Sequence, residues 1–237
     1  MDTFKKIIDL YEEQLNIPHN DNCQMCDSQY KEPLLPWVVG HKYFTENGGI
    51  FIGGKPHRGR PQGAKIRESG VIDGRDRGKQ LFLRGNWHYW SYTKAILEKL
   101  HGSAEDGWDH IAFSNVVKCT STSGKDKTSG NCAIQCIKKN EVIVKELELL
   151  KPRKIIFYTW SMHRKLFEEI PFAIKGSVTE HSSIHHRRKC GAKDLGWWDR
   201  TFTSTWGTKV DYLILGHPER MKKSEYVSLV SQWLKIP

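Results

Sequence analysis

Four short apolar runs limit the folds that this chain can adopt. They are rich in β-branched and aromatic residues, and they lack the polar alternation of a half-exposed strand: Gly49–Gly53, His110–Val117, Lys154–Trp160 and Asp211–Leu215. Continuous apolar runs of this length are typical of strands that are buried on both faces of a parallel sheet. We therefore expect four parallel strands at the centre of the fold.

Amphipathic helical patterns lie between or beside these runs. Apolar residues recur at every third or fourth position in Phe4–Leu15, Asn86–Leu100, Asn131–Leu150 and Ser224–Leu234. Strands that alternate with helices are joined by right-handed crossovers. The sequence therefore predicts one α/β domain over 1–237, a three-layer α/β/α fold with a central, mainly parallel four-stranded sheet and long loops at 55–80, 120–130 and 177–209. In such folds ligands bind at the carboxyl ends of the strands.

The charge and the hydropathy narrow the class of protein. Among 237 residues, 37 Lys and Arg against 27 Asp and Glu give a formal net charge of +10. This surplus favours polyanionic partners, because each Lys or Arg placed against a phosphate releases a condensed counterion. No stretch reaches the roughly 18 apolar residues of a membrane span, and the first residues do not resemble a signal peptide. We expect a cytoplasmic protein that binds nucleic acid, with no membrane partner and no obligate protein partner.

Three of the apolar runs end in residues suited to binding or catalysis. The first enters the turn Gly53-Gly54-Lys55-Pro56-His57, which can present backbone N–H groups to an anion. The second ends at Asn115, whose amide offers a donor and an acceptor to a nucleobase edge. His217 follows the fourth run and can stabilise a developing anion. Each feature alone is more commonly an ordinary turn or loop residue, so only their combination is specific.

In order and spacing the three motifs resemble those of the uracil-DNA glycosylase superfamily. Its iron–sulfur branch carries G-x-x-P-G, N-V-V-K-C and H-P-S, and the sequence here reads Gly53-Gly54-Lys55-Pro56-His57, Asn115-Val116-Val117-Lys118-Cys119 and His217-Pro218-Glu219. The resemblance extends from Cys23 to Pro237. It implies a uracil-DNA glycosylase-like fold, a base flipped out of DNA into a pocket at the strand ends, and cleavage of its N-glycosidic bond.

The resemblance also implies roles for single positions. Asn115 would read the flipped base, and His217 would stabilise the negative charge that grows on the departing base. Gly53 and Pro56 would shape the loop that holds the deoxyribose and the attacking water. The loop after His217 would press into the duplex, with Met221 as an apolar wedge and further DNA contacts from Pro218 and Arg220.

The first motif departs from that family. The branch has an acid directly after the first glycine, where it orients the water, whereas this chain has Gly54 and then Lys55. His57 or His217 would be a substitute, since a neutral imidazole accepts a proton near pH 7. The remaining alternatives are leaving-group stabilisation alone and a covalent adduct through His217.

The surroundings of the first motif also differ from a uracil pocket. A basic, Gly-rich loop at 55–80 intervenes, with Arg58 and Arg60 as candidate DNA contacts, and the ring that stacks on the base would be Phe82 or Tyr89. In the segment 177–209, the indoles of Trp197 and Trp198 can pack on the C–H face of a sugar or stack on a base. Packing of this segment onto the domain is the alternative role for both indoles.

These departures favour a roomier pocket than uracil needs. We interpret the chain as a DNA glycosylase that removes a modified pyrimidine, with glucosylated hydroxymethylcytosine of phage DNA as the favoured base and antiviral defence as the favoured role. A uracil-DNA glycosylase of base-excision repair is the first alternative. A catalytically inactive nucleic-acid-binding protein is the second.

The six cysteines indicate reduced thiols or metal ligands rather than a disulfide framework. Cys23 and Cys26 form a C-x-x-C pair. The resemblance matches this pair, Cys119 and Cys136 to the ligands of a structural [4Fe–4S] cluster, with Cys132 as a rival for the fourth place. Zinc and unligated thiols are the alternatives. Cys190 has no counterpart in the family.

Overall fold

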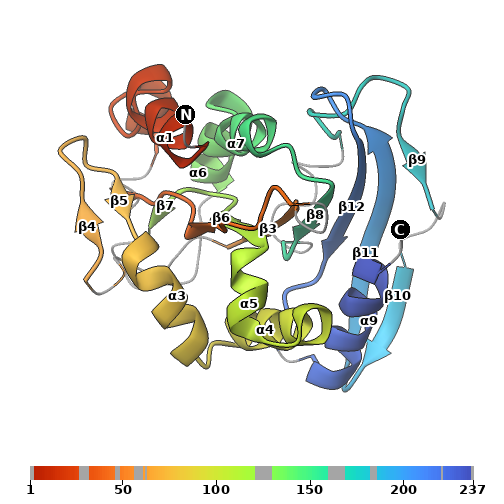
Figure 1. Cartoon of the computed structure of the whole chain (residues 1–237). Coiled ribbons are helices and arrows are strands. Elements are labelled where there is room, and N and C mark those ends of the chain that lie inside the picture. Colours follow the sequence, from red (N-terminus) through yellow and green to blue (C-terminus); the bar gives the residue numbers. More distant parts are fainter. Residues whose placement is uncertain are drawn as a thin grey trace.

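A parallel core of four strands organises the molecule (Figure 1). The computed structural model describes residues 3–26, 32–45, 49–55, 61, 63–120, 130–159, 169–181, 186–219 and 221–235. The four apolar runs form neighbouring parallel strands, in the spatial order β12 (Lys209–Leu215), β8 (Lys154–Phe157), β3 (Ile50–Gly54) and β6 (Ile111–Asn115). The mainly parallel α/β sheet expected from the sequence is thus confirmed.

Antiparallel strands extend this core on both sides, so the prediction of a four-stranded sheet is wrong. Among the described residues the sheet has eight strands. The additional ones are β2 (Val38–Val39) beside β6, and β9 (Thr179–Glu180), β10 (His186–Cys190) and β11 (Lys193–Thr203) beyond β12. The segment 177–209, expected as a loop, therefore supplies three strands. Its polar sequence conceals them, because β9 and β10 lie at the outer edge of the sheet and β11, beside them, keeps several exposed or half-buried residues.

Three of the four expected helices are confirmed. They are α1 (Thr3–Asp9) with its π-helical continuation η1 (Leu10–Gln14), α4 (His88–His101) and α9 (Lys223–Lys235). The pattern 131–150 was expected as one helix, but Glu141 has a φ of +52° and interrupts it. That left-handed residue divides the segment into α6 (Gly130–Ile134), the π-helical turn η2 (Gln135–Lys139) and α7 (Val142–Leu150).

Several short helices and strands lie where the sequence has no clear periodicity of apolar residues. The helices among them are α2 (Asp21–Gln24), α3 (Arg75–Arg84) and α5 (Ala104–Asp109). The strands form two pairs, β1 (Glu32–Pro33) with β7 (Cys119–Thr120) and β4 (Lys65–Ile66) with β5 (Ile72–Asp73). The expected loop 55–80 thus contains a hairpin and the start of α3. Of the described helices, none combines the length and the apolar character needed to cross a bilayer.

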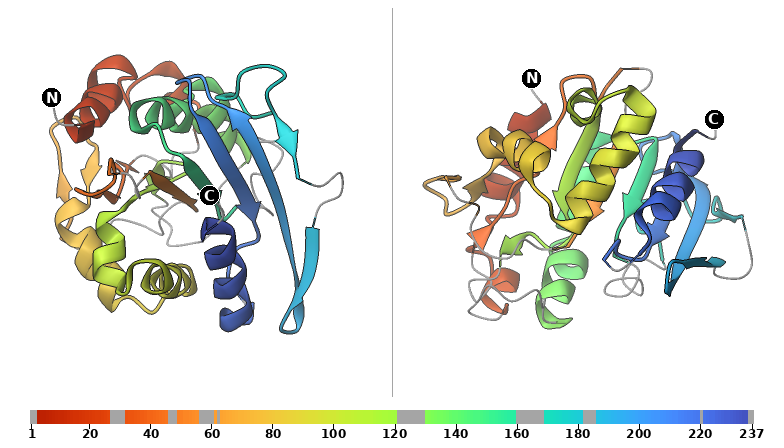
Figure 2. Two further views of the ribbon diagram at one scale, coloured as in Figure 1. Left: turned by 45° about the vertical axis from the view of Figure 1, so that its right-hand side comes forward. Right: turned by 90° about the horizontal axis from the view of Figure 1, so that it is seen from below.

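Helices cover both faces of the sheet, and each face has its own apolar core (Figures 1 and 2). Successive side chains of a strand point to opposite faces, so Phe51 and Ala112 join the core beneath α1, α6 and α7. Ile52 and Phe113 join the core beneath α3, α4, α5 and α9. We call the first side the α7 face and the second the α4 face.

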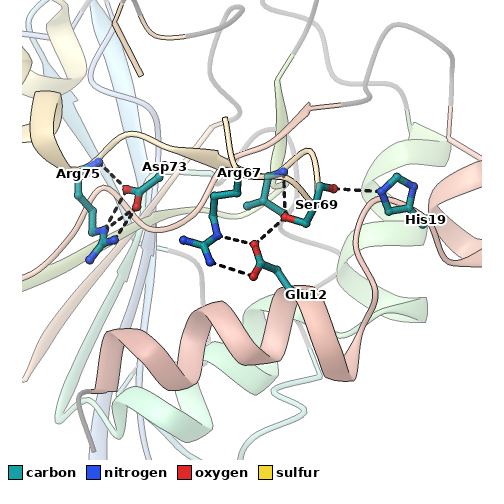
Figure 3. Close-up of polar contacts among 7 residues, drawn as sticks. Glu12, His19, Arg67, Ser69, Asp73 and Arg75 are labelled. Atoms are coloured by element: carbon teal, nitrogen blue, oxygen red, sulfur yellow. Dashed lines mark hydrogen bonds and ion pairs between the residues drawn. The ribbon is translucent and has the colours of Figure 1, made fainter. Parts of the chain in front are cut away.

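The β4–β5 hairpin is bound to the N-terminal helical segment by a polar network (Figure 3). The Arg67 guanidinium pairs with the Glu12 carboxylate, which also accepts a hydrogen bond of 2.6 Å from the Ser69 hydroxyl. A ring nitrogen of His19 lies 3.0 Å from the Ser69 carbonyl oxygen. These contacts fix the hairpin and the segment that leads to Cys23 relative to each other.

The strand order creates one preferred place for a ligand. The chain passes from β3 to β6 on one side and then to β8 on the other, so the order of the parallel strands reverses between β3 and β8. In open parallel sheets the crevice at such a reversal, outside the carboxyl ends of the strands, is the usual binding site. Gly53 and Gly54 end β3 at this point.

Candidate functional site

The structure brings Asn115 to the carboxyl end of the sheet, next to the first motif. Gly54 and Asn115 are register partners in the β3–β6 pair. Since Asn115 follows Phe113 by two residues, its side chain projects from the α4 face. The residue is 4% exposed, and within the described part of the chain its amide nitrogen has no hydrogen-bond partner. A buried amide donor of this kind is suited to a polar ligand.

His217 lies at the same edge and is held in a defined tautomer. The backbone N–H of Glu219 donates to Nδ1 of His217 over 3.1 Å. An accepting Nδ1 places the proton of a neutral imidazole on Nε2, which is then a donor. The chain before it is fixed as well, because the Tyr226 hydroxyl of α9 donates to the Gly216 carbonyl over 2.9 Å.

Tyr89, at the start of α4, joins these groups, whereas Phe82 does not. The Tyr89 and His217 rings stack with centroids 5.9 Å apart and planes 12° apart. Phe82 of α3 is fully buried, with its ring 4.4 Å from that of Trp108 and 5.6 Å from that of Trp90. The prediction that Phe82 stacks on a base is therefore wrong, because its ring is part of the core on the α4 face.

The two glycines of the first motif have no room for a side chain. A Cβ on Gly53 would lie 2.2 Å from the Phe157 ring, and a Cβ on Gly54 would lie 1.7 Å from the Tyr89 hydroxyl. Lys55 follows them and is half-buried. The other candidates of this loop and of the last motif fall outside the described residues, namely Pro56, His57, Arg58, Arg60 and Arg220.

Trp197 and Trp198 lie on opposite faces of β11, so they cannot contact the same ligand from one side. Trp197 is paired with Leu215 at the carboxyl end of β12 and packs on the α4 face, the face of Asn115. Trp198 is 8% exposed and lies beneath the guanidinium of Arg200. The expectation that both indoles contribute to one binding site is corrected, because neighbouring strand residues alternate in direction and only Trp197 lies on the face of Asn115.

The loop that follows His217 folds against the domain. Pro218 is buried, and the Met221 carbonyl accepts a hydrogen bond of 2.5 Å from the Tyr92 hydroxyl. The Met221 methyl group lies 3.8 Å from the place where a Cβ of Gly216 would be. Met221 thus packs half-buried beside the site, on the α4 face.

Five of the six cysteines gather on the opposite, α7 face. Cys119, Cys132 and Cys136 belong to that core, and Cys23 and Cys26 pack against it. The Cys132 and Cys26 side chains are hydrogen-bonded, and Cys119 interacts electrostatically with Cys136, Cys23 and Cys26. Cys190 lies apart, buried on the α4 face. The predicted gathering of the C-x-x-C pair with the later cysteines is thus present, together with the rival Cys132.

The environment of these thiols suits a bound cation. Burial and the neighbouring Cys26 raise the pKa of Cys23 to about 11, and burial raises the pKa of Cys136 to about 12. Several thiolates can therefore coexist here near pH 7 only when a cation compensates their charge. Donors already point at two of the sulfurs, since Asn140 Nδ2 lies 3.3 Å from Cys23 Sγ and the Lys118 backbone nitrogen lies 3.4 Å from Cys136 Sγ.

The spacing of the sulfurs bears on which metal they would hold. Among the described residues, no three cysteine sulfurs lie within 4.8 Å of one another. Tetrahedral zinc with Zn–S bonds of 2.3 Å would bring every pair of sulfurs to about 3.8 Å. The five thiols are therefore more widely spaced than a preformed zinc–thiolate site.

A second group with metal-binding donors lies near the amino end of β6, where α4 ends and α5 packs. The sequence patterns did not predict it. One ligand atom from each of His101, Asp106 and His110 lies within 4.8 Å of the others. The two imidazoles stack with centroids 4.3 Å apart and planes 13° apart. The lone pair of an imidazole nitrogen lies in the plane of its ring, so the lone pairs of two stacked rings do not point at a common ion. Binding of one ion by both histidines would therefore require one imidazole to rotate out of the stack.

A buried ion pair lies beside the cysteines, and the sequence pattern did not predict it. Lys118 Nζ donates to Glu146 Oε2 over 2.5 Å and to the Ser114 hydroxyl over 2.8 Å. The Tyr11 hydroxyl donates to Glu146 Oε1 over 2.5 Å. Lys118 and Glu146 are 1% and 0% exposed, respectively. The only hint in the sequence is a lysine within an otherwise apolar strand end.

Neither a protein-family model nor a curated protein sequence matches the chain. The assignment of a function therefore depends on the geometry described above and on the motifs.

Proposed function

We propose that this protein is a DNA glycosylase that hydrolyses the N-glycosidic bond of a flipped, modified pyrimidine and leaves an abasic site. The observation that carries the proposal is that Asn115, His217 and the Gly53–Gly54 end of β3 lie together at the reversal of the strand order, around the Tyr89 ring. Asn115 brings a buried amide donor that has no partner among the described residues, and a base edge would satisfy it.

In the proposed reaction the bond between C1′ and the base nitrogen breaks, and its electron pair leaves with the base. A water oxygen forms the new bond to C1′, and the proton that the water loses ends on the departed base. His217 would donate from Nε2 to the base as negative charge grows on it, because Nδ1 already accepts the Glu219 N–H. The chain's own residues thus account for recognition and for stabilisation of the leaving group.

The favoured base is glucosylated hydroxymethylcytosine, and the favoured role is defence against phage. Trp197 supports this choice, since its indole lies on the same face and at the same sheet edge as Asn115. An indole face suits the C–H face of a hexose. The strands β9–β11, which carry this residue, are additions to the parallel core.

We further propose that Cys23, Cys26, Cys119 and Cys136 hold a [4Fe–4S] cluster. All four donors are thiols, and two of these sulfurs accept N–H hydrogen bonds. The distances between the sulfurs are larger than a zinc–thiolate site requires. The cluster would cross-link the N-terminal segment to β7 and η2. Because the cysteines lie on the α7 face and the candidate site on the α4 face, its role would be structural.

The function is tested by incubating the protein with three DNAs and counting abasic sites with an aldehyde-reactive probe. The DNAs contain uracil, only unmodified bases, or glucosylated hydroxymethylcytosine. We expect signal on the glucosylated DNA alone. Signal on uracil alone would assign the protein to repair, and silence on all three would leave a nucleic-acid-binding protein without glycosylase activity.

A further inference from the structure

The Tyr89 hydroxyl occupies the space that a side chain at position 54 would need. A Cβ built on Gly54 would lie 1.7 Å from the Tyr89 hydroxyl oxygen and 2.4 Å from the ring carbon that bears it. Gly54 is the register partner of Asn115, so the hydroxyl lies beside the end of β3, on the face from which Asn115 projects. The heavy atom nearest to that Cβ position is therefore a hydroxyl oxygen, and α4 supplies it.

This hydroxyl is buried and, within the described part of the chain, has no hydrogen-bond partner. Burial, with a smaller effect of the neighbouring Tyr158, raises the pKa of Tyr89 well above its usual range. The group therefore stays neutral near pH 7, where it can both donate and accept a hydrogen bond but cannot act as an anionic base. A buried hydroxyl without a partner destabilises the folded state, and a polar ligand in this crevice would satisfy it.

The ring of Tyr89 is held rigidly on three sides. It lies 5.2 Å from the Phe113 ring, 5.2 Å from the Tyr158 ring and 5.9 Å from the His217 imidazole, measured between centroids. Phe113 and Tyr158 both belong to the core on the α4 face. A polar group fixed in this way needs no rearrangement when a ligand binds, which is the condition for electrostatic preorganisation.

We propose that the Tyr89 hydroxyl is a catalytic group that accepts a hydrogen bond from the attacking water and so aims a lone pair of that water at C1′. The proposal rests on the glycosylase function proposed above. The water oxygen bonds to C1′, the C1′–base bond breaks with its electron pair on the base, and the proton of the water passes to the departed base. Tyr89 stays neutral throughout, so the described site needs no carboxylate.

The variant Tyr89→Phe tests this role, because it keeps the ring and its three contacts and removes only the hydroxyl. The matched control is Tyr212→Phe, which removes an equally buried hydroxyl without a described partner on the α7 face. Both variants should unfold at or above the wild-type temperature, since each loses an unsatisfied polar group. Unchanged melting temperatures would show that any loss of activity does not come from misfolding.

The readouts are the first-order rate of abasic-site formation at saturating DNA and the dissociation constant for the same DNA. With whichever of the glucosylated and uracil-containing DNAs the wild-type protein cleaves, we expect Tyr89→Phe to lower the rate about 100-fold and to change the dissociation constant less than about twofold. Tyr212→Phe should match the wild type. Gly54→Ala, whose methyl group would displace the hydroxyl, should also lower the rate.

A wild-type rate for Tyr89→Phe would overturn the role of the hydroxyl and leave the glycosylase function intact. A rise in the dissociation constant without a fall in the rate would also contradict it, because it would make Tyr89 a binding residue only. A wild-type protein that forms abasic sites in neither DNA would overturn the glycosylase function, and this inference with it.

Discussion

At the scale of single residues, Asn115 combines burial with an unpaired donor, a combination that weakens a fold. Its amide nitrogen lacks a partner within the described residues, although the residue is only 4% exposed. Such a group destabilises the folded state by about 1–3 kcal/mol. Residues that weaken the fold while facing a ligand crevice are typical of functional sites.

We expect Asn115→Ala to abolish most base excision without lowering stability. The substitution removes the unpaired amide, which offsets the small cavity that it leaves, while the base loses its polar contact. The rate should fall about 100-fold or more, and the melting temperature should stay within a few degrees of the wild type. Single-turnover kinetics and thermal unfolding measure the two effects. A variant with full activity would exclude Asn115 from the site.

The buried Lys118–Glu146 pair gives a prediction about stability. Lys118→Met leaves the Glu146 carboxylate buried without its cation, and breaking a buried pair in this way costs about 3–5 kcal/mol. The double variant Lys118→Met with Glu146→Leu should recover much of that loss. The control is Lys65→Met, because the Lys65–Asp76 pair is 79% and 74% exposed and should contribute less than about 1 kcal/mol. Urea unfolding of the three variants measures these differences, and equal losses for Lys118→Met and Lys65→Met would contradict the account.

At the scale of elements, the parallel strands could be predicted and the antiparallel ones could not. β3 and β6 are buried along their whole length, so both begin with a continuous run of apolar residues. β10 lies at an edge of the sheet, and β11 beside it keeps several exposed or half-buried residues, so both strands contain charged residues that hide the strand pattern. The break at Glu141 had no sequence signal either, since a left-handed φ is uncommon for this residue type.

The same contrast applies to the candidate site. Asn115 and His217 could be placed from the sequence, because Asn115 ends β6 and His217 lies two residues after β12, at the edge where ligands bind in such sheets. Tyr89 reaches that edge from a helix that follows α3, and its position depends on the packing of α4 against the sheet. Phe82 was chosen wrongly for the same reason, as its sequence position does not reveal which way α3 faces.

The cysteine segment gives a prediction about metal content. We expect the protein purified without air to contain iron and acid-labile sulfide in a four-to-four ratio per chain, with visible absorbance. Serine at position 23 or 136 should remove the iron and lower the melting temperature. Cys190→Ser is the control, because this thiol lies on the other face of the sheet. Cys132→Ser should keep the iron, and stoichiometric zinc in place of iron would contradict the cluster.

At the scale of the whole molecule, the net charge gives a prediction about the proposed binding of DNA. A net charge of +10 and a site at one sheet edge favour contacts to phosphates around the flipped nucleotide. We expect DNA binding to weaken at least tenfold between 50 and 200 mM salt, the effect of about two phosphate contacts. Fluorescence anisotropy with a labelled duplex measures this dependence. His217→Ala should show the same salt dependence as the wild type, and affinity independent of salt would argue against phosphate contacts.

In this account the two faces of the sheet have different roles, one structural and one in the proposed reaction. The α7 face carries the cysteines and the N-terminal helices, and the α4 face carries Asn115, Tyr89, His217 and Trp197. Substitutions on the α7 face should therefore change stability first, whereas those at the carboxyl edge of the α4 face should change activity first.

The most direct measurement is the identity of the molecule set free from DNA. Glucosylated phage DNA is incubated with the protein, the polymer is removed by filtration, and the filtrate is analysed by mass spectrometry. The account predicts free glucosylated 5-hydroxymethylcytosine in an amount equal to the abasic sites formed, and none with Asn115→Ala. A filtrate without free base, or one that contains a base released equally by Asn115→Ala, would contradict the proposed function.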